Sequence, residues 1–136
     1  MRKVIPVAAV VVLLTAAFSF TQWATEAQCL IVGIGLVAIA LPLTLLSRVQ
    51  LGRAFAVGPK ATTLVTSGLY SKIPHPMYVF LDLALLGIVI AVRVPGLLGL
   101  LATLVVIQAW QSTREAKVLE DAFGEQYREY RARTWW

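Results

Sequence analysis

The stretch AQCLIVGIGLVAIALPLTLL, residues 27–46, holds no charged side chain. A helix that crosses the hydrocarbon core of a bilayer needs about 20 apolar residues, because each residue adds only about 1.5 Å to its length. Residues 27–46 therefore have the length and composition of a transmembrane helix. Three further apolar runs occupy residues 4–20, 77–92 and 94–110. We predict that each of these runs also forms a membrane helix.

The composition of the whole chain agrees with this prediction. Of the 136 residues, 59% are hydrophobic and 14% are charged, whereas soluble globular domains carry about 25% charged residues. This composition excludes a soluble globular protein, and the length indicates one domain over residues 1–136. A single cysteine, Cys29, excludes an intrachain disulfide and a multi-cysteine metal framework. We therefore predict an all-α integral membrane bundle with four transmembrane helices and no metal.

The basic residues support a multi-pass topology. The chain has 12 lysines and arginines against 7 acidic residues, a formal net charge of +5. Basic residues that flank membrane helices gather on the cytoplasmic side. With both termini cytoplasmic, every basic residue except Arg93 lies on that side. We predict a multi-pass protein of the cell inner membrane, and we explain the positive charge by topology and by attraction to anionic lipid rather than by nucleic-acid binding.

Two segments outside the apolar runs have a character of their own. Residues 47–75 are rich in glycine, proline and hydroxyl side chains, which favours an irregular cytoplasmic loop with backbone groups available for binding. Residues 113–131 place apolar side chains three or four positions apart, which predicts a cytoplasmic amphipathic helix. We expect its two tyrosines, Tyr127 and Tyr130, to pack against the bundle.

Polar side chains recur at helical spacing near the start of the third apolar run. His75, Tyr78 and Asp82 are separated by three and four residues, so they share one face if a helix begins at Pro76. An ionisable residue inside a membrane helix marks a functional site by default. Two simpler roles stay open: Asp82 as a hydrogen-bonded packing group, and His75 as a helix cap or interfacial residue.

The fourth apolar run carries a similar polar face. Gln108, Ser112 and Glu115 are separated by four and three residues. If the two faces meet, they enclose a polar pocket at cytoplasmic depth. Such a pocket would admit a polar cofactor from the cytosol and an amphiphilic substrate from the bilayer. Spacing alone does not identify either ligand.

Several short motifs carry a resemblance to known enzymes. In order, they are Leu51-Gly52-Arg53, Leu64-Val65-Thr66-Ser67-Gly68-Leu69-Tyr70, His75-Pro76-Met77-Tyr78, and Glu115 followed by Leu119, Phe123-Gly124, Tyr127 and Tyr130. Together they resemble the isoprenylcysteine carboxyl methyltransferase family and its phospholipid-methyltransferase relatives over residues 51–131. The resemblance implies an integral membrane enzyme that uses S-adenosylmethionine to methylate a lipidic or membrane-embedded acceptor. It also implies that the cofactor lies between the His-Pro-x-Tyr segment and the carboxylate after the last span.

The resemblance assigns roles to matching positions. His75 and Tyr78 line the cofactor pocket, and Glu115 accepts hydrogen bonds from the cofactor's ammonium group or ribose hydroxyls. Further candidates for cofactor binding are Tyr70 and Gln108. Candidates for catalysis are Glu115, Arg53 and Asp82, of which Asp82 comes from helical spacing alone. A carboxylate, an amine or a thiol can be the acceptor; an amine needs a proton acceptor, for which Asp82, Glu115 or His75 would serve.

The chain departs from the family pattern at three positions. Pro74 stands where the family usually has arginine, Ala116 where it has a second glutamate, and Thr63 where many members have histidine. Arg53, Lys72 or the helix amides after Pro76 are candidates to replace the missing arginine, because a helix N-terminus favours anions.

Two other functions stay open. The departures at Pro74 and Ala116 favour a noncatalytic membrane protein that keeps the fold and binds a lipid or a partner. A nicotinamide-dependent reductase is weaker, since the chain has no dinucleotide fingerprint. The sequence does not indicate an oligomeric state.

Overall fold

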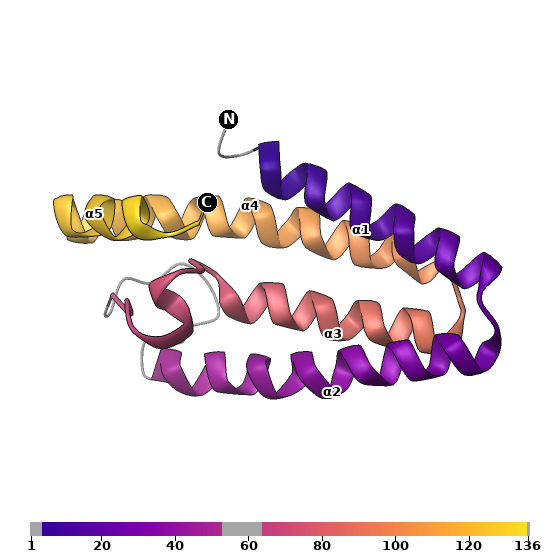
Figure 1. The fold of residues 1–136 in the computed structure, drawn as a ribbon. Helices are drawn as coiled ribbons and strands as arrows, with labels where there is room; N and C mark the ends of the chain where they lie inside the picture. The colour runs from indigo at the N-terminus through magenta and orange to yellow at the C-terminus, as the bar shows by residue number, and fades with distance from the viewer. Residues whose placement is uncertain (1–3, 53–63, 136) are drawn as a thin grey trace.

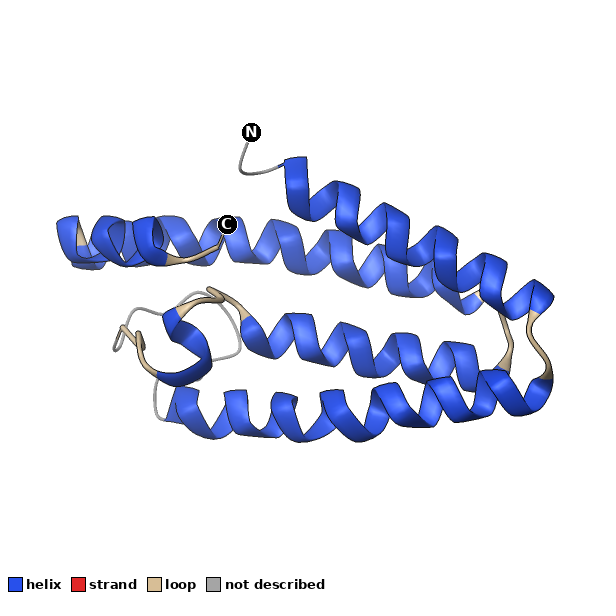
Figure 2. Ribbon diagram, in the orientation of Figure 1, coloured by secondary structure: helices blue, strands red, loops and turns tan. Residues whose placement is uncertain are grey.

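The computed structural model describes residues 4–52 and 64–135, and their side chains from residue 7 onward. Within these ranges every regular element is helical, which confirms the all-α prediction (Figure 2). The elements are α1 (Val4–Trp23), α2 (Glu26–Leu51), the short 3₁₀-helix η2 (Gly68–Ser71), α3 (Pro76–Val92), α4 (Leu97–Phe123) and α5 (Glu125–Arg133).

The four long helices run side by side in alternating directions (Figure 1). α3 contacts α1, α2 and α4, so it is the central helix of the bundle. The α1–α2 turn and the α3–α4 turn lie at one end. η2, the start of α3, the end of α4 and α5 lie at the other end, and this second end carries the candidate site.

α2 is the clearest candidate for a membrane helix among the described residues. It begins with a capping box, in which the Thr25 hydroxyl accepts from the Gln28 backbone and the Gln28 side chain accepts from the Thr25 backbone. Its 26 residues extend for about 39 Å at 1.5 Å per residue, enough to cross a bilayer core of about 30 Å. In the described residues it alone has the length and composition to cross a membrane; Val7–Trp23 and α3 are apolar but shorter. The count of four membrane helices thus remains a prediction.

Two glycines allow α2 and α3 to approach closely. A Cβ atom added at Gly33 of α2 would collide with the Gly87 carbonyl oxygen and lie 2.6 Å from the Ala91 Cβ. A Cβ added at Gly87 of α3 would lie 2.7 Å from the Gly33 carbonyl oxygen. Backbone meets backbone at this crossing, as at the small-residue contacts typical of membrane helices. The apolar core beside this contact includes Cys29, which is fully buried.

The C-terminal half differs from the sequence prediction. Residues 113–131 do not form one separate helix: α4 continues without a break from the apolar run to Phe123, and α5 begins at Glu125. A fall in hydropathy does not end a helix, and the segment between Gly99 and Gly124 has no glycine or proline to end it. The break comes at Gly124, whose φ of 52° lies in the region that favours glycine. Similarly, α2 extends to Leu51, so the first residues of the predicted 47–75 loop are helical.

Candidate functional site

The start of α3 presents His75 and Tyr78 together. His75 is the N-cap residue and Pro76 occupies the first helical position, where its missing N–H costs no hydrogen bond. The side chain of Pro76 is fully buried, which fixes the origin of the helix. The imidazole and the phenol ring are stacked, with centroids 5.7 Å apart and planes 17° apart. The helix start expected at Pro76 is therefore observed.

Glu115 of α4 joins this pair from the neighbouring helix. The Tyr78 hydroxyl donates a hydrogen bond of 3.0 Å to Glu115 Oε1. Gln111, one turn earlier on α4, donates to the same oxygen at 3.3 Å. His75 Nδ1 lies 3.6 Å from Glu115 Oε2. The His75 and Glu115 side chains are 23% and 20% exposed, so this polar cluster is half-buried and the two predicted polar faces do meet.

Asp82 and Gln108 form a second polar contact deeper between α3 and α4. Gln108 is buried, and its amide faces the Asp82 carboxyl. Asp82 Oδ1 is buried and has no hydrogen-bond partner among the described residues. Ser112, the third member of the predicted α4 face, instead donates to the Ala109 carbonyl of its own helix at 2.9 Å.

Tyr70 is held beside this cluster by contacts from both sides. Gly68, with φ of 61°, begins the turn, and the Gln50 side chain at the end of α2 accepts from the Leu69 N–H at 2.9 Å. The positive φ at this position favours glycine, and a Cβ there would also lie 2.6 Å from the end of the Gln50 side chain. From α5, the Tyr130 hydroxyl donates to the Tyr70 carbonyl at 2.8 Å. Burial and the negative charge of Glu115 raise the pKa of Tyr70 to about 12, against a smaller opposite effect of Arg48.

The C-terminal tyrosines have the packing role that we expected. Tyr127 and Tyr130 are both buried, and Tyr130 ties α5 to η2. The backbone N–H of Trp135 also donates to the Lys72 carbonyl at 2.9 Å. The chain end thus holds the segment that leads into His75.

Sequence reasoning proposed two further cations for this cluster, Arg53 and Lys72, and missed two of its neighbours. Arg53 lies outside the described residues, and Lys72 is exposed. Sequence reasoning missed Gln111, although its position four residues before Glu115 places it on the same helix face. It also missed Arg131 of α5, whose charge acts on His75, because only the fold of α5 back toward η2 brings them together.

The environment of His75 gives a testable pH dependence. Burial, and then the positive charge of Arg131, lower the pKa of His75 from 6.5 to about 4, so the imidazole is neutral at pH 7 despite its contact with the Glu115 carboxylate. Because the pKa of His75 is lower in the folded protein, the unfolded chain binds a proton on this imidazole more strongly. The contribution of His75 to the free energy of unfolding is therefore constant above about pH 6.5 and falls as the pH drops toward 4.

We expect an NMR titration of His75, the only histidine of the chain, to give a midpoint below 5. The Arg131→Gln variant should raise that midpoint. A midpoint at or above 6.5 would contradict this description and would indicate an imidazolium–carboxylate pair with Glu115.

A comparison with protein families identifies the family of this chain. A family model described as phospholipid methyltransferase matches residues 28–126, a range that holds α2 from residue 28 onward and all of η2, α3 and α4. The chain belongs to the phospholipid methyltransferase family. This match confirms the phospholipid-methyltransferase part of the resemblance found in the sequence, and the family is one of membrane-associated methyltransferases. No curated protein and no solved structure matches the chain. The matched range includes His75, Tyr78, Asp82 and Glu115, whereas Tyr127 and Tyr130 lie beyond it.

Proposed function

We propose that this member of the phospholipid methyltransferase family is an active methyltransferase that transfers a methyl group from S-adenosylmethionine to a lipidic acceptor. The observation that carries the proposal is the half-buried Glu115 carboxylate, fixed by Tyr78 and Gln111 beside His75. Family membership supports the reaction class.

The residues of this cluster suit the proposed cofactor. S-adenosylmethionine carries an ammonium group, a ribose diol and a sulfonium, all of which favour a nearby carboxylate. The hydrogen bonds from Tyr78 and Gln111 both end on Glu115 Oε1. Among the described residues, Oε2 is approached by His75 Nδ1 at 3.6 Å, so Oε2 keeps lone pairs that can accept from a ligand. A charge-assisted hydrogen bond to a carboxylate is roughly twice as strong as a neutral one.

The protein's main contribution to the reaction is positioning. S-adenosylmethionine, when bound, supplies an electrophilic methyl group on a sulfonium. Tyr78 and Gln111 hold the Glu115 carboxylate in one orientation, and the half-buried surroundings strengthen its attraction for a cation. Correct alignment of donor and acceptor is worth up to about 7–11 kcal/mol in favourable cases.

An amine acceptor would also need a group that removes its proton. His75 is one candidate, because its imidazole is unprotonated at pH 7, but a pKa lowered to about 4 makes it a weak base. Asp82 is the second candidate, because its buried Oδ1 has no partner among the described residues. Neither group is required for an anionic carboxylate or thiolate acceptor.

Arg131 is an additional candidate for the family arginine that this chain lacks. Pro74 is buried and cannot donate a hydrogen bond through its side chain or its backbone nitrogen. Arg131 acts electrostatically on His75, so a permanent cation is present near the cluster although it comes from α5. We therefore propose Arg131, alongside Arg53, Lys72 and the α3 amides, as a donor for an anionic part of the cofactor.

The proposed membrane arrangement places this site at the cytoplasmic end of four crossing helices. Large apolar side chains are exposed along α1 and α2, among them Val11, Phe18, Ile31 and Ile39, as expected for surfaces in contact with lipid tails. The η2–α5 end carries most of the described basic residues, which supports cytoplasmic termini. A lipidic acceptor could then reach the cluster from the inner leaflet.

Methyl transfer can be measured directly on the purified protein. We expect S-adenosylmethionine labelled in its methyl group to pass label into the organic phase of a membrane-lipid extract. Treatment with base would then separate acceptor classes, because a methyl ester releases methanol whereas an N-methyl or S-methyl group does not. Binding of S-adenosylhomocysteine without transfer to any lipid fraction would overturn the proposal in favour of a noncatalytic protein.

A further inference from the structure

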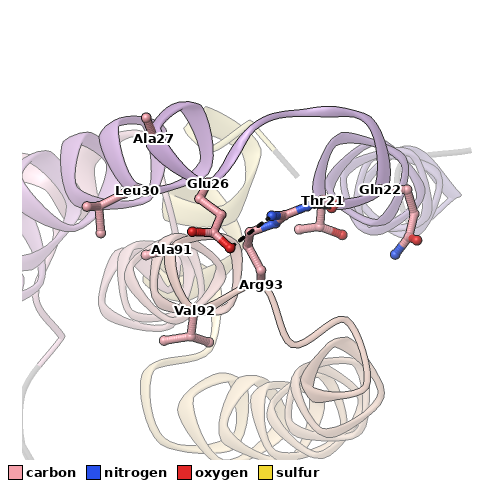
Figure 3. A pocket seen from close by; sticks show the side chains of 8 residues that line it. All are labelled: Thr21, Gln22, Glu26, Ala27, Leu30, Ala91, Val92 and Arg93. Atoms are coloured by element: carbon pink, nitrogen blue, oxygen red, sulfur yellow. Dashed lines mark hydrogen bonds and ion pairs between the residues drawn. The ribbon is translucent and has the colours of Figure 1, made fainter.

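A cavity of about 800 Å³ lies at the end of the bundle opposite to Glu115. It is formed where the end of α1, the start of α2 and the end of α3 come together (Figure 3). Its lining residues are Thr21, Gln22, Glu26, Ala27, Leu30, Ala91, Val92 and Arg93. Ligand pockets for small molecules typically have volumes of about 300–1,000 Å³, so the cavity is large enough for a lipid head group and its glycerol.

Arg93 is the central polar residue of this cavity. It is the C-cap of α3 and has φ of 54°, the only positive φ of a non-glycine residue among those described. Its guanidinium donates to the Thr21 carbonyl through one terminal nitrogen at 3.3 Å. Its Nε atom is buried and has no hydrogen-bond partner in the described part of the chain. Among the described residues the terminal nitrogens make one hydrogen bond, to Thr21, so the partly exposed guanidinium keeps N–H donors for a ligand, in the planar geometry that suits phosphate oxygens.

Glu26 gives the cavity a second charge of opposite sign. Glu26 Oε1 lies 3.8 Å from Arg93 Nη1, beyond hydrogen-bond distance. The Glu26 side chain is 90% exposed, whereas that of Arg93 is 34% exposed. Figure 3 shows the two side chains reaching toward each other from α2 and α3. A loosely paired cation and anion at one site fit a ligand that carries both charges.

The surroundings of the cavity point to the membrane interface. The cavity lies at the N-terminal end of α2, the helix with the length and composition to cross a bilayer. Trp23, in the same turn, is 90% exposed, and tryptophan prefers the head-group level of a membrane. Leu30 and Val92 add apolar surface next to the charges.

We propose that this cavity binds the head group of a zwitterionic phospholipid in the leaflet opposite to the Glu115 site, with the phosphate on Arg93 and the ammonium on Glu26. The inference concerns a second site and does not require methyl transfer. It rests on α2 crossing the bilayer.

Native mass spectrometry of the purified protein with added dioleoyl phosphatidylethanolamine or phosphatidylglycerol tests the proposal. We expect the Arg93→Gln variant to bind both lipids at least tenfold more weakly than the wild type. The Glu26→Gln variant should keep phosphatidylglycerol and lose its preference for phosphatidylethanolamine. The Ala27→Phe variant, which fills the cavity without altering Arg93, should lose both. Lys117→Gln, which changes an exposed cation toward the other end, is the matched control.

Two results would overturn the proposal. One is an unchanged lipid preference in Glu26→Gln together with unchanged lipid binding in Ala27→Phe. Because the Glu26 side chain is exposed, Glu26→Gln should fold and stay informative even if Arg93→Gln does not fold. The other is displacement of the lipid by millimolar inorganic phosphate, which would indicate a site for a free anion only. Binding of S-adenosylhomocysteine should be the same in all folded variants. Failure of the wild type to bind S-adenosylhomocysteine would count against the proposed function and not against this lipid site.

Discussion

Replacing Gly33 by leucine is expected to cause the largest loss of stability in this chain. A Cβ atom at Gly33 has no room, because the Gly87 carbonyl oxygen and the Ala91 backbone nitrogen, at 2.7 Å, already occupy the space. Both atoms belong to the α3 backbone, so no side-chain rotation relieves the collision. Overpacking a well-packed core typically costs about 1–3 kcal/mol, and we expect the upper end of this range or more.

Gly35 is a matched control on the same helix. A Cβ atom at Gly35 meets nothing within 4 Å, so the Gly35→Leu variant should keep its stability or gain up to about 1 kcal/mol from better helix propensity. Gly87→Leu should behave like Gly33→Leu. The unfolding temperatures of these three variants can be compared in detergent, with the fluorescence of the four tryptophans as the signal. Equal unfolding temperatures for Gly33→Leu and Gly35→Leu would show that the α2–α3 contact is not as close as described.

The second large effect is expected from Glu115→Gln. Glutamine keeps the shape of the side chain and can still accept from Tyr78, but it removes the negative charge. Hydrogen bonds that involve a charged group contribute about 1.5–3 kcal/mol, which corresponds to a loss of about 10- to 150-fold in affinity for S-adenosylhomocysteine. We expect methyl transfer to fall by at least the same factor.

Glu120→Gln separates this effect from a general change of charge on α4. Glu120 lies on the same helix, is 46% exposed and pairs with Arg128 at 2.8 Å, so its replacement should leave affinity unchanged. Isothermal titration with S-adenosylhomocysteine measures both variants. If Glu115→Gln binds as tightly as the wild type, the role given to this carboxylate is wrong.

The parts of the fold that the sequence could predict are those set by local chemistry. An uncharged run long enough to cross a bilayer predicted α2, and Pro76 at the first helical position predicted the start of α3. The continuation of α4 past its apolar run was missed, because hydropathy reports the environment of a helix and not its end. The end is set by Gly124, through its positive φ.

The candidate site was predictable only in part, for a related reason. Helical spacing placed His75 and Tyr78 together, and the family resemblance indicated Glu115 as their partner. The register between α3 and α4, which brings the Tyr78 hydroxyl to Glu115 Oε1, depends on packing that spacing does not contain. The approach of Arg131 and Tyr130 to the segment before α3 depends on the reversal of the chain at Gly124. The Gly33–Gly87 contact likewise became evident only once both helices were in place.

The central claim is that the cluster around Glu115 binds S-adenosylmethionine, and it is tested most directly by the small molecules that the purified wild-type protein retains. Mass spectrometry of the denatured sample should detect S-adenosylmethionine or S-adenosylhomocysteine in an amount comparable to the protein, and much less in Glu115→Gln. Detection of a nicotinamide nucleotide, or of lipid alone in a protein that also fails to bind added S-adenosylhomocysteine, would contradict the claim.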